Sequence, residues 1–183
     1  MRAINWQSGA IINLVETSAQ MIRVERAIKI AVTQKEAFEY VANHGNTRTF
    51  MPNIRRFEPR GEKPYGLGAR FYWQTVYCGL KLGCEFVVTD FEPYTWMAAK
   101  GLSVPRSTSS WFFEPADGGT VAILSVGYEI PRALVPKWLG GMLVQRELAT
   151  NIDRSLANLK VQLEAMPRPV TSPSRASSSG GHH

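Results

Sequence analysis

The sequence contains too few cysteines and histidines for the common metal sites. Its 183 residues include two cysteines and three histidines, and two of those histidines are the last residues of the chain. The remaining His44 and the two cysteines have no spacing that is typical of zinc ligands. Gly66 and Gly68 lack the third glycine of a dinucleotide-binding loop. We therefore expect no bound metal and no cofactor.

Long apolar runs are also missing, which argues against a transmembrane segment. No segment approaches the roughly 20 apolar residues that cross a bilayer as a helix. The short apolar stretch at residues 10–15 contains Asn13 and precedes no convincing cleavage site. These features predict a cytoplasmic protein. Cys78 and Cys84 flank a predicted turn and could pair across it, but in a reducing compartment we expect two buried thiols.

A strong charge imbalance is absent from the predicted folded region. The formal net charge is +6, but Arg2, Arg168 and Arg175 lie in predicted tails, and residues 21–165 carry 18 cations against 14 anions. An excess of this size does not identify a nucleic-acid partner. The densest basic cluster lies at residues 55–60 and is interpreted as a solvated strand edge, with phosphate contact as the alternative.

The sequence does contain a regular succession of predicted strands. Alternating apolar residues predict a first strand over residues 22–32, in which Arg26 is the one charged residue on the inner face. Thr33 and Glu36 form a capping-box pattern that begins a short helix, and residues 47–51 add one helical turn. Six further strands are predicted at residues 54–59, 69–77, 80–91, 95–101, 106–114 and 120–130.

A long amphipathic helix is predicted over residues 136–165. Its apolar stripe comprises Trp138, Met142, Gln145, Ala149, Ile152, Leu156, Leu159 and Leu163. Such a stripe must be buried against a sheet, and a curved sheet under one helix often leaves a cavity. Residues 21–166 are therefore expected to form one domain. An extension at residues 1–20 precedes it, and a disordered tail rich in Pro, Ser and Gly follows at residues 167–183.

Several short motifs occur in an order that is specific to one fold. They are Ile28-Lys29-Ile30, Glu36-Ala37-Phe38-Glu39-Tyr40-Val41, Phe50-Met51-Pro52, Gly66-Leu67-Gly68-Ala69-Arg70-Phe71, Phe91-Glu92-Pro93, Trp111-Phe112-Phe113-Glu114-Pro115, Gly118-Gly119-Thr120 and Tyr128-Glu129-Ile130-Pro131. In this order, residues 22–165 resemble the START-like (SRPBCC) superfamily of polyketide cyclase/dehydrase-like proteins.

The resemblance implies an α+β helix-grip fold with a cavity. In this fold a curved antiparallel β-sheet wraps around a long C-terminal α-helix, and two short helices follow the first strand. The matching motifs are turns and core positions, and none of them is a catalytic signature. The superfamily includes carriers, sensors, cyclases, quinone-binding proteins and co-chaperones, so the resemblance does not decide the function.

Strand alternation places a mostly aromatic set of side chains toward the long helix. The predicted ligand-binding residues are Phe71, Trp73, Phe86, Val88, Trp96, Trp111, Phe113, Leu124, Tyr128, Met142 and Arg146. Each of these residues taken alone is more readily explained as part of a packed core, but the set is typical of a small-molecule site. We therefore expect a cavity of roughly 300 Å³ or more that accepts a small hydrophobic molecule.

Residues suited to catalysis are few. Arg146 lies at the edge of the helix stripe and faces either the cavity or the surface. With Tyr128 it could hold a carboxylate or polarise a carbonyl. His44 lies in a predicted loop, where a solvated or helix-capping role is the interpretation. Residues 132–135 lie between two prolines and could form a lid, a membrane-contacting loop or a plain connection.

The leading hypothesis is therefore binding or transport of a small hydrophobic ligand, such as a lipid, a quinone or a polyketide-like aromatic, without catalysis. The alternatives are an enzyme of the polyketide cyclase or aromatase type and a protein–protein interaction module. The sequence predicts no specific nucleic-acid partner, allows transient contact with a membrane surface, and does not predict the oligomeric state.

Overall fold

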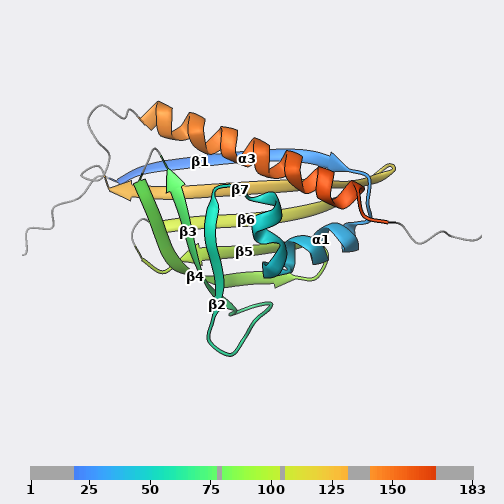
Figure 1. The fold of residues 1–183 in the computed structure, drawn as a ribbon, viewed down its shortest axis with the longest axis horizontal. Helices are drawn as coiled ribbons and strands as arrows, with labels where there is room; N and C mark the ends of the chain where they lie inside the picture. Colours follow the sequence, from blue (N-terminus) through green and yellow to red (C-terminus); the bar gives the residue numbers. More distant parts are fainter. Residues whose placement is uncertain (1–18, 78–79, 104–105, 132–140, 168–183) are drawn as a thin grey trace, which may run out of the picture.

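Seven strands form one antiparallel sheet in the computed structural model, which describes residues 19–77, 80–103, 106–131 and 141–167. The order across the sheet is β1-β7-β6-β5-β4-β3-β2 (Figure 1). The strands are β1 (Ala19–Ile30), β2 (Ile54–Arg60), β3 (Arg70–Tyr77), β4 (Leu80–Glu92), β5 (Trp96–Gly101), β6 (Arg106–Ala116) and β7 (Gly119–Pro131). The predicted helix-grip fold is confirmed.

Short helices connect β1 to β2. They are α1 (Gln34–Ala42), the three-residue 3-10 helix η1 (His44–Asn46) and α2 (Thr47–Phe50). The predicted capping box is present at α1, because Thr33 Oγ1 accepts from the Glu36 amide at 3.2 Å and the Glu36 carboxylate accepts from the Thr33 amide at 2.8 Å. The predicted starting point of the first helix is therefore confirmed.

The long helix α3 (Gly141–Glu164) lies across the β1 and β7 side of the sheet (Figure 1). It buries Val144, Leu148, Ile152, Leu156, Leu159 and Leu163 in one core with residues of β1, β7, α1 and α2. The predicted stripe is right in its second half and wrong in its first half, where Met142 is 83% exposed and Gln145 is exposed. Trp138 lies outside the described residues. Apolar residues stand at helical spacing on two neighbouring faces here, so spacing alone did not select the buried one.

Ionic and polar contacts connect the C-terminal half of α3 to the end of β1. Arg26, the charged residue on the inner face of β1, reaches Asp153 of α3 with 3.2 Å between Nε and Oδ1. Lys160 donates from Nζ to the Lys29 carbonyl at 2.8 Å, and the Ala31 amide donates to the Glu164 carboxylate at 2.8 Å. Arg26 is therefore accommodated by a partner on the helix, and it stays exposed.

Several predictions fall outside the described residues. These are the extension up to residue 18, Cys78, the loop at residues 132–135, the start of the long helix before residue 141, and the tail from residue 168. Cys84 is buried and its thiol is free. Within the described ranges, none of the helices combines the length and the apolar character that crossing a bilayer requires.

Candidate functional site

A cavity of about 190 Å³ lies between the concave face of the sheet and the segment from the end of α1 to β2. Its lining comes from α1, η1, α2, the loop after β2, and strands β2 to β7. None of the described α3 residues contributes to it. The predicted position between the sheet and the C-terminal helix is therefore wrong. The buried α3 side chains pack directly on β1 and α2.

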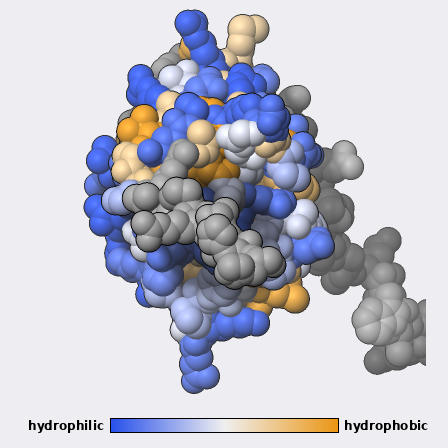
Figure 2. Space-filling model, turned by 90° about the vertical axis from the view of Figure 1, so that its right-hand side faces the viewer, coloured by the Kyte–Doolittle hydropathy of each residue, from blue (hydrophilic) through white to orange (hydrophobic). Residues whose placement is uncertain are grey.

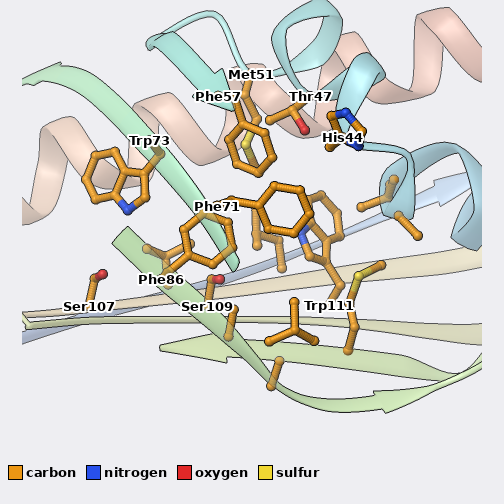
Figure 3. Close-up of a pocket in the computed structure, with 18 of the residues that line it drawn as sticks. His44, Thr47, Met51, Phe57, Phe71, Trp73, Phe86, Ser107, Ser109 and Trp111 are labelled. Carbon is orange, nitrogen blue, oxygen red and sulfur yellow. The ribbon is translucent and has the colours of Figure 1, made fainter. Parts of the chain in front are cut away.

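Three phenylalanine rings form one wall of the cavity. Phe57 of β2, Phe71 of β3 and Phe86 of β4 have ring centroids separated by 5.3 Å (Phe57 to Phe71), 5.4 Å (Phe71 to Phe86) and 5.5 Å (Phe57 to Phe86). Their strands are hydrogen-bonded neighbours, so the three rings meet across the sheet. Figure 3 shows these rings facing the interior. Rings packed this closely support one another and form a stiff apolar surface.

Tryptophans occupy two other parts of the lining. Trp111 of β6 is buried, and it forms a T-shaped contact with Phe50 of α2, with ring centroids 6.0 Å apart and ring planes at 82°. Trp73 of β3 lies 6.3 Å from Tyr128 of β7, measured between ring centroids. The sheet curves enough to bring β3 and β7 close together, although three strands separate them in the sheet order.

Hydroxyl groups line the cavity near Trp73. Ser107 and Ser109 lie two residues apart on β6, and Figure 3 shows both projecting toward the aromatic rings. Ser107 pairs across the strands with Tyr128, which also lines the cavity. Gly101 of β5 adjoins Ser107, since a Cβ atom on Gly101 would lie 2.6 Å from Ser107 Oγ.

His44 and Thr47 contribute polar atoms from the helical side. Thr47 is buried, and the His44 ring lies 5.7 Å from the Phe71 ring (Figure 3). His44 itself is half-buried, and the side chain of Asn43 caps η1 by accepting from the Gly45 amide at 3.0 Å. The predicted capping role of His44 is therefore wrong, whereas its partial exposure agrees with a partly solvated ring. Sequence reasoning missed His44 as a lining residue, since only the fold of the α1 to α2 connection turns it inward.

The cavity reaches the surface beside Tyr65. This residue lies in the loop between β2 and β3, lines the cavity and is 47% exposed. Its ring packs against Phe91 with centroids 4.9 Å apart. Partial burial raises the pKa of the Tyr65 phenol, and the nearby Glu39 and Tyr94 act in the same direction. The neutral phenol is therefore favoured at this opening.

Most of the predicted pocket residues come together in this cavity. Those that line it are Phe71, Trp73, Phe86, Val88, Trp111, Leu124 and Tyr128. Phe113 is buried but packs against Phe38 of α1, with centroids 5.6 Å apart, in the solid core. The aromatic and aliphatic strand residues were thus placed mostly on the correct face, but not all of them border the cavity.

Trp96 was predicted on the wrong face of β5. It pairs with Phe112 of β6, and the two rings stack with centroids 5.3 Å apart on the face away from the cavity. The inner positions are Met97 and Ala99, which line the cavity and pair with Trp111 and Ser109. Because β5 carries apolar side chains at both alternating positions, only its register with β6 decides which ones face inward.

Met142 and Arg146 were predicted to face the cavity, and this placement is wrong. Both are exposed on the first turns of α3, where they border a shallow surface depression with Arg23, Glu25 and Arg26 of β1. Arg146 and Tyr128 therefore do not converge on one cavity. The predicted catalytic pair is not assembled in the described structure.

The basic cluster at residues 55–60 lies on the outer side of β2. Arg56 and Arg60 lie over the Tyr72 ring, 5.6 Å and 5.4 Å from its centroid, and both form ion pairs with Glu58. These contacts agree with a solvated strand edge. Within the described residues, no group of three or more His, Cys, Asp and Glu side chains could hold a metal ion.

Comparisons with known proteins agree with this architecture. The profile of the family described as polyketide cyclase/dehydrase and lipid transport matches residues 21–164. None of the curated proteins matches the sequence significantly.

Solved structures with the same fold include aromatase/cyclase proteins. The aromatase/cyclase Zhui from Streptomyces sp. R1128 is 16% identical, with a TM-score of 0.66, over 79% of this chain and 94% of that one. The di-domain ARO/CYC BexL from the BE-7585A biosynthetic pathway is 21% identical, with a TM-score of 0.64, over 80% of this chain. This chain matches only 51% of BexL. At these identities the likeness shows the fold alone.

Proposed function

The chain belongs to the polyketide cyclase/dehydrase and lipid transport family, and from this premise we propose that it binds a small apolar or aromatic molecule in the cavity under α1, α2 and β2. The observation that carries this proposal is a space of about 190 Å³ with five phenylalanines and two tryptophans in its lining. Concave sites with an apolar, aromatic lining and a few polar groups are typical of small-molecule binding.

The volume narrows the range of ligands. The expected value was roughly 300 Å³ or more, so the observed cavity is smaller than predicted. It corresponds to about six water molecules at roughly 30 Å³ each. A compact molecule suits a space of this size better than a long acyl chain does. Compact ring compounds are therefore favoured over lipids as ligands of the described cavity.

Native mass spectrometry tests this proposal directly. The protein is purified from its own source, measured under native conditions and then denatured, and any released small molecule is identified. The matched pair of variants is Ala99→Phe, which fills the cavity from β5, and Ala27→Phe, which places the same side chain on an exposed position of β1.

We expect a stoichiometric apolar compound with the wild type and with Ala27→Phe, and none with Ala99→Phe. Retention of the compound by Ala99→Phe would place binding elsewhere. The proposal would be overturned if the purified wild-type protein releases no small molecule and also binds no member of a library of small ring compounds.

An aromatase or cyclase is the second candidate, because His44 lies in the same apolar space as the hydroxyls of Ser107, Ser109 and Tyr128. Histidine is the most frequent general acid or base near neutral pH, and hydroxyls could orient a carbonyl. His44→Gln keeps the size and polarity of the side chain and removes its acid–base function. An enzyme of this type would lose at least about 100-fold in turnover of a polyketide substrate, whereas a binding protein would keep its ligand.

The cavity argues against the interaction module, which predicted an interior filled by side chains. Figure 2 shows one end of the molecule, where hydrophilic residues predominate and hydrophobic residues form small separate spots in the part that grey atoms do not cover. Protein docking surfaces usually present larger continuous apolar patches. Ligand binding therefore remains the proposal that the geometry supports best.

A further inference from the structure

The inner face of β6 changes from hydroxyl-bearing to aromatic along the strand. Residues two apart share one face of a strand, so the following four side chains form one inward row: Ser107, Ser109, Trp111 and Phe113. Their partners on β7 change in the same direction: Tyr128, Val126, Leu124 and Ala122. One end of the cavity floor therefore offers hydroxyl groups, and the floor becomes apolar toward the core.

The serine hydroxyls have spare hydrogen-bonding capacity. Ser109 Oγ forms no hydrogen bond with any residue in the described part of the chain, and the contact of Ser107 Oγ is the Cys84 sulfur at 3.9 Å. A serine hydroxyl offers one donor and two acceptor positions, while a thiol is a weak partner. Both serines can therefore bond a ligand oxygen without giving up a strong internal bond.

Gly101 keeps the space beside Ser107 open. A Cβ atom at this position would lie 2.6 Å from Ser107 Oγ and 3.2 Å from the Cys84 sulfur, both closer than ordinary contacts. Any other residue would displace the Ser107 hydroxyl or cover it. The absence of a side chain on β5 thus keeps the hydroxyl accessible to the cavity.

Size and polarity limit what can bind between this hydroxyl end and the aromatic wall. An apolar cavity of about 150 Å³ in another protein accommodates benzene, so about 190 Å³ suits one ring with a short substituent. An ionised ligand would lose its hydration among Phe57, Phe71 and Phe86, and uncompensated burial of a charge costs far more than one hydrogen bond returns.

We propose that the cavity selects an uncharged one-ring molecule with its hydroxyl or carbonyl oxygen bound by Ser107 and Ser109 and its ring against the phenylalanine wall. This inference rests on the proposed ligand-binding function and specifies the ligand class. Ser107 and Ser109 set the orientation of the ring, and Gly101 gives the oxygen access.

The test uses three probes of similar shape, with affinities measured by isothermal titration calorimetry. p-Ethylphenol and p-ethyltoluene have the same number of non-hydrogen atoms, but only the first can hydrogen-bond. p-Ethylbenzoate carries a charge in the same position. The readout is the ratio of the dissociation constants of p-ethyltoluene and p-ethylphenol, because a general loosening of the fold changes both constants together.

The variants distinguish a loss of hydrogen bonding by Ser107 and Ser109 from a general disturbance of β6. Ser109→Ala is expected to lower the ratio by about tenfold, the size of one lost hydrogen bond. The double variant with Ser107→Ala removes both hydroxyls and should lower the ratio further. Gly101→Ala leaves both hydroxyls present but crowds Ser107, and it should lower the ratio in the same direction. Ser110→Ala is the matched control, since this serine lies on the same strand and does not line the cavity.

The outcomes distinguish this inference from the proposed function. If both neutral probes bind and the ratio does not change in Ser109→Ala or the double variant, the serine assignment is wrong while ligand binding stands. Tighter binding of p-ethylbenzoate than of p-ethylphenol would overturn the preference for uncharged ligands. Binding of none of the three probes would overturn this inference, while the proposed function is decided separately by the native mass spectrometry experiment.

Discussion

The two halves of the sheet are covered in different ways. Over β1 and β7, the α3 side chains Ile152, Leu156 and Leu159 fill the space, and each of them is buried. Over β3 to β6, the cover is the short segment from α1 to β2, and a cavity remains beneath it. Both halves present similar apolar strand faces. The difference shows that the covering element decides whether such a face becomes core or cavity.

The largest expected effect lies in the packed half. Leu156→Ala removes a side chain that is 2% exposed in the α3 interface, and such truncations cost about 2–5 kcal/mol in the free energy of unfolding. Urea denaturation measures the change. Val161→Ala, at a position on the same helix that is 64% exposed, should cost less than about 0.5 kcal/mol. A similar cost at both positions would mean that α3 packs through a different face.

The same substitution in both halves tests the comparison more sharply. Ala122→Val adds two methyl groups at a position of β7 that is 0% exposed, and overpacking of this kind costs about 1–3 kcal/mol. Ala99→Val adds them at the cavity lining on β5, where there is room, so we expect a change within about 0.5 kcal/mol. Thermal unfolding of both variants measures the difference. Equal destabilisation would contradict the presence of free space beside Ala99.

A smaller effect on the free energy of unfolding is expected at α1, which contacts both halves of the sheet. α1 contributes Phe38 to the core and Val41 to the cavity lining, and Thr33 caps its first turn. Thr33→Ala should lower the free energy of unfolding by about 1 kcal/mol. Thr33→Ser, which keeps the capping oxygen, should retain most of the stability. Equal losses in the two variants would show that the cap contributes little.

The smallest effect concerns the opening at Tyr65. Burial raises the pKa of this phenol above its ordinary value of 10.0, so the folded protein binds the proton more tightly than the unfolded chain does. Stability is therefore unaffected below that value and falls as the pH rises through it. Comparing urea midpoints of the wild type and Tyr65→Phe across alkaline pH isolates this contribution. Identical pH dependence of the two proteins would rule it out.

Local signals in the sequence predicted the elements well. The Thr33 and Glu36 box begins α1, and strand alternation placed Phe71, Trp73 and Phe86 toward the interior. These predictions succeeded because capping and alternation depend on residues a few positions apart. Arg26 looked like a misfit only because its partner, Asp153, lies far along the chain.

The incorrect predictions share one physical cause. Trp96 was assigned inward because the register between β5 and β6 cannot be read from β5 alone. Met142 was assigned to the buried stripe because Val144 and Leu148 offer a neighbouring face at the same helical spacing. His44 was not recognised as a lining residue because its loop was considered without the sheet that it covers.

The sequence by itself determined the strands, the starts of α1 and α2 and the apolar character of the inner face, since these follow from local hydrogen bonding and from side-chain periodicity. Only the tertiary structure decided where that apolar face is left open. The position and size of the cavity depend on α3 covering β1 while the α1 to β2 segment spans the other strands. The tertiary structure also brings Ser107, Gly101 and His44 into the lining of one cavity, because contacts between distant parts of the chain depend on how its elements pack.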